Sequence, residues 1–395
     1  MAIKDYVLCE RDYIISLRRY FHENPEESLK EFNTARKIEN ELEKLGIPYK
    51  RVGETGVIGI IKGELKSDKV VALRADIDGL KVNDLKDKDY KSKNEGFMHA
   101  CGHDGHTASL IGAAKILNDK KSILSGEVRL FFQQAEEIGQ GAKVFINEGY
   151  LKDVDSIFGI HVASDISVGK VAVTDGPICA SCDYFKIRVI GKSGHVSRPH
   201  LSVDALYIAS QIVVSVQGIV SRNTDPLDTV VVGIGTMQAG TIYNAVAGEA
   251  VLEGTTRAFS KESRERVNKS IVDIANNIGS MYNAEIEIEF KDYASPLIND
   301  KKVTCEVKKI AENILGHENI ISDSVKKLGA DDFAEYLLTV PGTYARVGTR
   351  NVENINTCVS HHNEFFDIDE EGLLVATNLE VDYVLSKLAN SHYVL

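Results

Sequence analysis

The first half of the chain alternates helical and strand patterns of apolar positions. Helical spacing runs from Asp12 to Leu45, with a break at Asn24-Pro25 and a stop at Gly46, which predicts two helices. Continuous apolar runs typical of strands buried on both faces follow, together with a further helical stretch over 108–117. These runs cover residues 56–61, 70–73, 128–132 and 156–162. Strands that alternate with helices predict an α/β domain with a mostly parallel sheet flanked by helices.

The pattern changes to period two after about residue 180. Apolar and polar residues alternate in YFKIRVIGKSGH, DTVVVGIGTMQAG, EAVLEGTTRAF and AEIEIEF, around helical stretches over 205–220 and 261–282. This β-α-β-β-α-β order predicts an inserted α+β domain, residues 182–294, in which two helices back an antiparallel sheet. We expect residues 1–181 and 295–395 to form one catalytic domain.

Composition and charge narrow the classes of partner. The chain has 395 residues and a formal net charge of −12, which argues against nucleic acid or an anionic membrane surface, because both are bound by clustered Lys and Arg. No continuous apolar run approaches the roughly 18 residues of a membrane span, and the charged start has no signal-peptide core. We therefore expect a cytoplasmic protein. The 6 cysteines follow no regular spacing, which predicts reduced thiols.

Potential metal ligands gather where the predicted strands end. Cys101 and His103 lie in the stretch MHACGHDGHTASLIGAAKIL, just before a predicted helix. The other candidates follow strands or come from the C-terminal segment: Asp76, Asp78, Glu136, Glu137, His161, His361 and His362. Ligands bind beyond the carboxyl ends of strands in open α/β sheets, so we expect these side chains to meet. Carboxylate, imidazole and thiolate together suit Zn²⁺, Mn²⁺ or Co²⁺ rather than Ca²⁺.

Each of these residues alone carries little information. A lone histidine such as His161 is more often structural, a Cys-x-His pair occurs by chance, and paired glutamates usually form a solvated helix face. The joint placement at strand ends favours a site. Glu136 and Glu137 share that site only if the chain bends after its strand, because adjacent side chains of an extended strand point to opposite faces.

A family resemblance follows from motifs spread in order over nearly the whole chain. They are RRYFHENPEES, RADIDGL, MHACGHDGHTA, QQAEEIGQGA, GIHV, GKSGHVSRPHLSVDAL, EGTTRAFS, LGADDFAEYL and HHNEFFDID. Together they resemble the amidohydrolase branch of the aminoacylase and carboxypeptidase G superfamily of dinuclear metallopeptidases. That branch includes hippurate hydrolases, N-acetyldiaminopimelate deacetylases and auxin-amino-acid hydrolases.

The resemblance implies a set of site residues and a quaternary role for the inserted domain. Two divalent ions, Mn²⁺, Zn²⁺ or Co²⁺, would be held with the thiolate shared between them, and the inserted domain would act as a lid and a dimerisation surface. We therefore expect a homodimer or higher homo-oligomer. The implied ligands are Cys101, His103, Glu137, His161 and His362.

The remaining implied residues are a base, two oxyanion donors and a substrate contact. Glu136 matches the general base, which takes a proton from water and returns it to the departing amine. His195 and Asn244 resemble lid residues that stabilise the oxyanion. Arg257 matches the arginine that grips the free carboxylate of the departing amino acid, although a surface arginine paired with Glu253 or Glu262 would look the same.

The chain departs from the family pattern at several places. Lys81, Gln134, Ala247 and Glu364 stand where proline is common, and Asp331 stands where glutamate is usual. None of the four residues in place of proline is an implied ligand, so these departures bear on loop stiffness and substrate fit rather than on activity.

The expected function is metal-dependent hydrolysis of the amide bond of N-acyl amino acids. A dipeptidase or carboxypeptidase acting on short peptides would use the same residues. Two hypotheses from other functional classes remain: a thiol hydrolase that uses Cys101 with His103, and a binding protein without catalytic activity. Residues two apart rarely form a nucleophile-base pair, and a binding protein needs no base such as Glu136. The CASC pair, Cys179 and Cys182, lacks a second CxxC and is not expected to bind metal.

Overall fold

The computed structural model describes residues 3–389 and divides into two compact units. Over the described residues, unit 1 comprises 3–176, Ile298–Val325 and 331–389, and unit 2 comprises Pro177–Leu297 and Lys326–Ala330. Unit 2 extends beyond the expected inserted domain, residues 182–294, at both ends. It also includes the short segment 326–330, which the sequence expectation placed with the catalytic domain. Backbone carbonyl groups of this segment accept hydrogen bonds from the amide of Ala180, so tertiary contacts that no local pattern reveals assign it to unit 2.

Unit 1 is built on an eight-stranded sheet of order β1-β2-β4-β3-β5-β16-β6-β15. The strands are β1 (Tyr49–Val52), β2 (Gly56–Lys62), β3 (Leu65–Asp76), β4 (Ser125–Gln133), β5 (Ser156–Ser167), β6 (Val171–Ala172), β15 (Ile320–Ile321) and β16 (Gly342–Arg350). The central strands β4, β3, β5 and β16 are parallel, and β1 and β2 add an antiparallel edge. The predicted α/β class with a mostly parallel sheet is confirmed.

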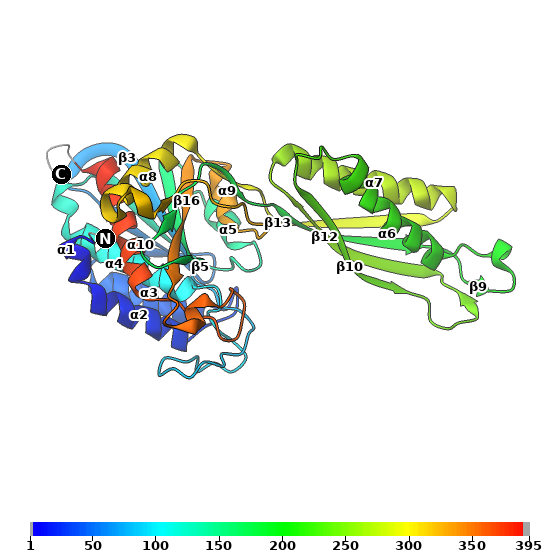
Figure 1. Cartoon of the computed structure of the whole chain (residues 1–395), viewed down its shortest axis with the longest axis horizontal. Helices are drawn as coiled ribbons and strands as arrows, with labels where there is room; N and C mark the ends of the chain where they lie inside the picture. The colour runs from blue at the N-terminus through cyan, green and yellow to red at the C-terminus, as the bar shows by residue number, and fades with distance from the viewer. Residues whose placement is uncertain (1–2, 390–395) are drawn as a thin grey trace. The chain divides into compact units, whose positions relative to one another are not determined.

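Helices pack around this sheet (Figure 1). They are α1 (Asp5–Leu8), α2 (Arg11–Glu23), α3 (Phe32–Lys44), α4 (His103–Asp119), α5 (Gly141–Asn147), α8 (Lys301–Leu315), α9 (Phe333–Leu337) and α10 (Glu371–Leu388). Helix α4 contacts β3, α2 and α10. Every residue of α4 from 103 to 114 is buried, which fits the apolar and small residues that follow the polar first turn of the helix.

Two boundaries differ from the sequence expectation, and both affect the site. Helix α4 begins at His103 rather than at Ala108, so the histidine-rich motif forms its first turns. Strand β5 continues to Ser167, so His161 lies inside a strand and not at its end. The pairing of β5 with β16 runs past His161, which extends the strand beyond its apolar run.

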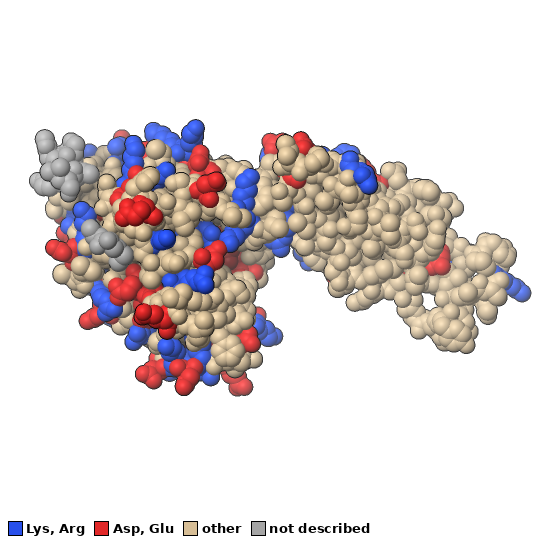
Figure 2. Space-filling model, in the orientation of Figure 1, with Lys and Arg blue, Asp and Glu red and all other residues tan. Residues whose placement is uncertain are grey.

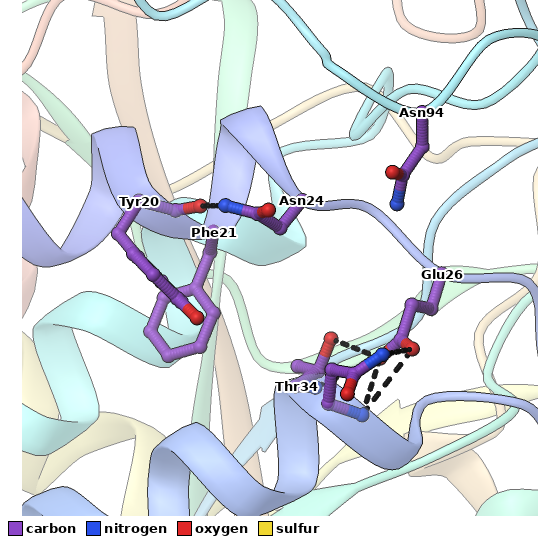
Figure 3. Close-up of a pocket in the computed structure, with 7 residues that line it drawn as sticks. Tyr20, Phe21, Asn24, Glu26, Thr34 and Asn94 are labelled. Carbon is purple, nitrogen blue, oxygen red and sulfur yellow. Dashed lines mark hydrogen bonds between the residues drawn. The ribbon is translucent and has the colours of Figure 1, made fainter.

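A polar cavity of about 290 Å³ marks the start of α3 (Figure 3). It is lined by Tyr20, Phe21, Asn24, Glu26, Asn33, Thr34 and Asn94. The Glu26 carboxylate accepts hydrogen bonds from the backbone amides of Asn33 and Thr34 at 2.9 and 2.8 Å. Glu26 therefore satisfies two of the amides that the first turn of a helix leaves unpaired, and this fixes where α3 starts.

Unit 2 contains a four-stranded antiparallel sheet of order β10-β12-β8-β13. Its main elements are β8 (Cys182–Ile190), α6 (Ala205–Arg222), β10 (Val230–Ala239), β12 (Glu249–Ala258), α7 (Lys261–Met281) and β13 (Glu285–Ala294). Alternate residues of β8, Phe185, Ile187 and Val189, enter the core. Helices α6 and α7 lie side by side over one face of this sheet (Figure 1). Short strands are β7 (Gly176–Cys179), β9 (Gly194–His195), β11 (Ala245–Val246) and β14 (Leu297–Asn299).

Helix α6 is long and apolar enough, by length and composition alone, to cross a membrane, the one such helix among residues 3–389. The same composition is typical of a helix that packs in a protein core. Ile208, Ile212 and Val216 of α6 are buried in the core of unit 2. This packing accounts for the apolar residues on the buried face of α6, whereas Leu206, Tyr207 and Val214 stay exposed.

Candidate metal centre

Two aspartates, Asp76 and Asp78, lie at the carboxyl end of β3, and each holds one histidine of α4. Nδ1 of His106 donates to Asp76 at 2.6 Å, and Nε2 of His106 accepts the backbone N–H of Val162 at 2.9 Å. Both ring nitrogens of His106 are therefore engaged. His106 is left without a nitrogen for a metal ion, although it lies beside the predicted ligands.

His103 is arranged in the opposite sense. Its Nδ1 donates to the carbonyl oxygen of Asp78 at 2.9 Å and lies 3.2 Å from Oδ1 of the same residue. Its Nε2 is buried and has no hydrogen-bond partner among the described residues. Metal-binding histidines generally donate their second ring nitrogen to a carboxylate or carbonyl in this manner, which fixes the tautomer.

Cys101 precedes α4 and faces β5. Its Sγ lies 3.5 Å from Nε2 of His161, whose Nδ1 donates to the carbonyl of Val162. The next residue, Gly102, has φ of 92°, and a Cβ atom there would lie 2.3 Å from Cγ2 of Val162. Only glycine fits this turn, which turns Cys101 toward His161 while α4 begins at His103.

Glu136 and Glu137 follow β4 after a sharp bend. Ala135 has φ of 54°, a left-handed conformation that is rare for a residue with a side chain. Oε1 of Glu137 lies 3.8 Å from Nε2 of His103 and 3.6 Å from Nε2 of His362. The expectation that the chain must bend for both glutamates to share one site is confirmed.

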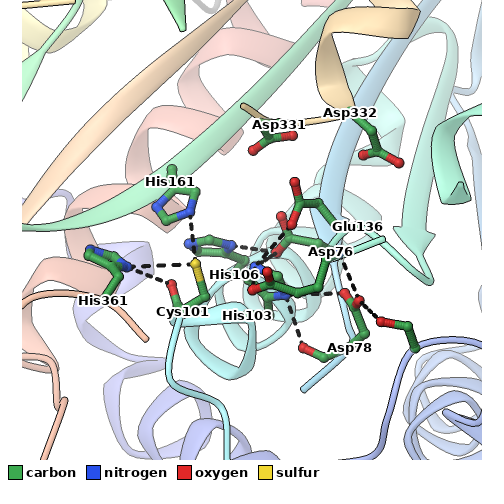
Figure 4. A network of polar contacts seen from close by, with 12 residues as sticks. Asp76, Asp78, Cys101, His103, His106, Glu136, His161, Asp331, Asp332 and His361 are labelled. Atoms are coloured by element: carbon green, nitrogen blue, oxygen red, sulfur yellow. Dashed lines mark hydrogen bonds and ion pairs between the residues drawn. The ribbon is translucent and has the colours of Figure 1, made fainter. Parts of the chain in front are cut away.

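The five predicted ligands form two groups that share one sulfur atom. Cys101, His103 and His161 place one donor atom each within 4.8 Å of one another, and so do Cys101, Glu137 and His362. Figure 4 shows Cys101, His103 and His161 around one space. Two groups of three with Cys101 common to both match the shared thiolate that the family resemblance implies.

The electrostatics of these side chains fit divalent cations. Burial and the charge of Glu137 raise the pKa of the Cys101 thiol well above its usual range. Burial raises the pKa of Glu137 to about 7. Burial lowers the pKa of His103, but Asp76 and Asp78 outweigh it and raise that pKa to about 10. The buried cluster thus holds protons until a cation replaces them, and Oε1 of Glu137, like Nε2 of His103, is buried without a hydrogen-bond partner in the described structure.

This environment argues against the thiol-hydrolase alternative. The attacking species of a thiol hydrolase is the thiolate, which forms only when a neighbouring positive charge lowers the pKa of the thiol. Burial, followed by the charges of Glu137 and Glu136, raises the pKa of Cys101 even though His103 lies in the same donor group. Without a cation, Cys101 is a poor nucleophile.

A buried ion-pair network lies on the other side of Glu136. Arg74 donates to Asp76 at 2.5 Å and to Asp332 at 2.8 Å, and Tyr344 donates to Asp331 at 2.6 Å. Carboxylate oxygens of Glu136, Asp331 and Asp332 lie within 4.8 Å of one another (Figure 4). Burial and then the charge of Asp331 raise the pKa of Glu136 well above its usual range.

A second buried network supports the first turn of α4 and was missed by sequence reasoning. Nε of Arg18 donates to Asp104 at 3.0 Å, and Nδ1 of His22 lies 2.6 Å from the same carboxylate oxygen. Arg18 also donates to Asp367 at 2.7 Å. The RRYFH motif thus holds Asp104, the residue next to His103, although Arg18 and Asp104 are 86 positions apart in the chain.

His361, unlike the adjacent His362, does not belong to either donor group. Its Nδ1 lies 3.2 Å from the carbonyl oxygen of Cys101, and its Nε2 accepts the amide of Ser164 at 3.5 Å. Its neighbour His362 has φ of 65°, and its amide donates to the carbonyl of Ala100. This unusual backbone conformation places His362 in a donor group, while His361 packs behind Cys101.

The other three predicted residues belong to unit 2. Nδ1 of His195 accepts the backbone N–H of Ser197 at 3.1 Å, so the proton of the neutral ring lies on Nε2, a hydrogen-bond donor. Asn244 directly precedes β11, which pairs with β9 at His195. Their role in oxyanion stabilisation stays a prediction.

Arg257 lies on β12 and is half-buried. Its guanidinium donates to the backbone carbonyl of Leu328 at 3.4 Å. Over the described residues it makes no ion pair with Glu253, which accepts from Tyr184, or with Glu262. The alternative of a surface ion pair is therefore not favoured, and the guanidinium keeps donors for a ligand carboxylate.

Comparisons with known proteins give the family of the chain. Residues 72–386 match the model of peptidase family M20/M25/M40. The chain is 41% identical to thermostable carboxypeptidase 2 of Saccharolobus solfataricus over 92% of both chains, and 39% identical to an N-acetylcysteine deacetylase of Bacillus subtilis over 92% and 94%. A crystal structure of a dinuclear metal-binding M20 peptidase from Bacillus subtilis is similar with a TM-score of 0.84, 35% identity and coverage of 96% and 99%.

The two donor groups predict the metal content of variants. Purified protein should contain up to two divalent ions per chain, and Cys101→Ala should lose at least one, because both groups need its sulfur. Plasma mass spectrometry of dialysed protein measures this. His106→Gln is the matched control and should retain its metal, because both His106 nitrogens are already engaged. Full metal content in Cys101→Ala would remove the thiolate from the site.

Proposed function

Because the chain belongs to peptidase family M20/M25/M40 and is a metal-dependent hydrolase of amide bonds, we propose that it deacylates N-acyl amino acids with a free α-carboxylate. The observation that carries the proposal is the place of Glu136, a buried carboxylate beside two donor groups that share Cys101. Such a carboxylate is what a general base for hydrolysis requires, whereas a protein that only binds metal or peptide has no use for one.

The proposed ligands would hold one ion with Cys101, His103 and His161 and a second with Cys101, Glu137 and His362. Ions bound there would supply the Lewis acidity that acidifies a water molecule and polarises the amide carbonyl. Mn²⁺, Zn²⁺ and Co²⁺ all accept this mixture of thiolate, imidazole and carboxylate donors.

Glu136 moves the proton in the proposed reaction. Its carboxylate lies 4.0 Å from Nε2 of His103, directly beside the donor groups. Glu136 takes a proton from the water as the oxygen bonds to the carbonyl carbon. It then delivers that proton to the amide nitrogen as the C–N bond breaks, so that a carboxylic acid and a free amine leave.

The substrate class rests on Arg257 and on one relative. An arginine fork binds a carboxylate in bidentate geometry, which a lysine ammonium does not. The Bacillus subtilis relative is named for deacetylation of an N-acyl amino acid. A second candidate, cleavage of dipeptides or removal of C-terminal residues from short peptides, is favoured by the Saccharolobus relative, which is named a carboxypeptidase. Parallel turnover of N-acetyl, benzoyl and aminoacyl amino acids with Mn²⁺, Zn²⁺ or Co²⁺ separates the two.

Replacing Glu136 separates proton transfer from metal binding. Glu136→Gln should keep its metal and bind substrate with a similar KM, but kcat should fall by about 10²-fold or more, because the amide cannot accept a proton. Glu137→Gln, one residue further along, is the control and should lose metal as well. Near-normal turnover by Glu136→Gln would refute its role as the base.

Arg257 predicts discrimination between an acid and its amide. A charge-assisted hydrogen bond contributes about 1.5–3 kcal/mol, so an N-acyl amino acid should exceed its C-terminal carboxamide by about ten- to a hundredfold in kcat/KM. Arg257→Ala should remove the preference. Arg266→Ala, which removes an arginine paired with Asp228, should keep it. Equal turnover of acid and amide by the unmodified enzyme would contradict both Arg257 and the specificity for a free carboxylate.

We further propose that copies of the chain meet through helix α6. No charged residue occurs in α6 before Arg222, and Leu206, Tyr207 and Val214 expose 45%, 46% and 71% of their surface. The face of unit 2 in Figure 2 shows few charged side chains over this helix. Exposed apolar surface of this kind marks contacts between proteins, and a second copy supplies the same surface.

Light scattering after size exclusion tests this contact. The unmodified chain should show a mass of at least twice the 43.4 kDa of one chain, and Val214→Glu should shift it toward the monomer, because it buries a charge at the contact. Asn277→Glu, which adds the same charge to an exposed position of α7, should leave the mass unchanged. A monomeric unmodified chain would contradict the proposal.

A further inference from the structure

The backbone bend before the paired glutamates is held under strain. Only five described residues other than glycine have positive φ, and two of them, Ala135 and His362, lie at the metal centre. For a residue with a side chain this conformation costs free energy and persists only when neighbouring groups enforce it. In Ala135 the conformation turns the chain so that the side chains of both Glu136 and Glu137 reach the same site.

One carboxylate from outside the site holds this bend. The backbone N–H of Ala135 donates to Oε1 of Glu31 at 2.9 Å, and the hydroxyl of Thr55 donates to Oε2 at 2.6 Å. Glu31 is 0% exposed and stands at the start of α3, where Glu26 fixes the helix. Burying a carboxylate costs free energy unless hydrogen bonds compensate it. The two oxygens of Glu31 obtain this compensation from Ala135 and Thr55.

The second side of the bend is held from within the site. The backbone N–H of Glu137 donates to Oδ2 of Asp78 at 3.0 Å, and Asp78 also accepts from His103. The amides of Ala135 and Glu137 are thus both fixed by carboxylates, on either side of Glu136. Glu31 is the member of this pair that touches no predicted ligand.

We propose that Glu31 is a positioning residue, which holds Ala135 in its left-handed conformation and thereby aims Glu136 at the reaction and Glu137 at the metal. The inference rests on the proposed function for the role of Glu136. The placement of Glu137 does not depend on which amide is cleaved. A structural role alone would predict that loss of Glu31 lowers stability without changing the metal centre.

The affinity and visible absorption of Co²⁺ test the proposal without a substrate, because both report the ligands around the ion. Glu31→Met fills a similar volume but accepts no hydrogen bond, and it should weaken Co²⁺ binding by about tenfold or more and change the spectrum. Glu31→Gln should stay within about threefold of the unmodified protein, because its amide oxygen accepts from Ala135 while its NH₂ group donates to the Thr55 hydroxyl.

A second substitution at the bend makes the test specific. Glycine adopts positive φ without the cost that alanine carries. Ala135→Gly combined with Glu31→Met should therefore recover about fivefold of the lost Co²⁺ affinity and a spectrum closer to that of the unmodified protein. If Glu31→Met alone fails to fold, recovery of soluble, cobalt-binding protein in the double variant supports the proposal, and continued aggregation overturns it.

The remaining outcomes separate this inference from the proposed function. Glu31→Met with unchanged Co²⁺ affinity and spectrum, or a double variant no better than Glu31→Met, overturns the positioning role. Where the unmodified enzyme hydrolyses its substrate, kcat should follow the same order as Co²⁺ affinity, with KM changed less than about threefold. An unmodified protein that binds Co²⁺ yet cleaves no N-acyl amino acid or short peptide refutes the proposed function, while the cobalt series still decides the role of Glu31.

Discussion

The hydrogen bonds that Asp76 and Asp78 accept from two histidines decide what the site is able to hold. Both carboxylates are buried at the carboxyl end of β3, where an unpaired charge would be costly. Asp76 engages His106, whose other nitrogen is taken by a backbone amide. Asp78 engages Nδ1 of His103 through its backbone carbonyl and its carboxylate, and leaves Nε2 directed at Glu137 and the metal centre. Two neighbouring histidines of one helix thus acquire different roles from their partners alone.

The buried frame behind the ligands makes this arrangement rigid. Helix α4 is enclosed by β3, α2 and α10, and the buried pair of Arg18 and Asp104 fixes its first turn. Ligands on such elements are held near their productive geometry before any ion binds. Backbone strain is confined to segments without regular structure, where Ala135 and His362 adopt left-handed conformations. These segments carry Glu136, Glu137 and the His362 imidazole.

The sequence was most informative where pattern and chemistry coincide. Strand ends followed by acids, and Cys101 only two residues from His103, were sufficient to predict a group of candidate ligands at one edge of an α/β sheet, while the choice of five among them came from the family resemblance. What sequence reasoning missed depends on distant pairing: Arg18 finds Asp104 across 86 positions, and β5 extends past His161 because β16 continues beside it. The conformation of Ala135 was not predictable in detail, because alanine has no preference for positive φ and Glu31 enforces it from another element.

Diffraction measured at the absorption edge of cobalt, from crystals grown with Co²⁺, tests the central claim most directly. The account predicts two anomalous peaks, both at bonding distance from Sγ of Cys101, about 2.3 Å for a metal–thiolate bond. One peak should lie at Nε2 of His103 and the other at the carboxylate of Glu137. A peak coordinated by His106, or a pair of peaks of which neither contacts Cys101, would contradict it.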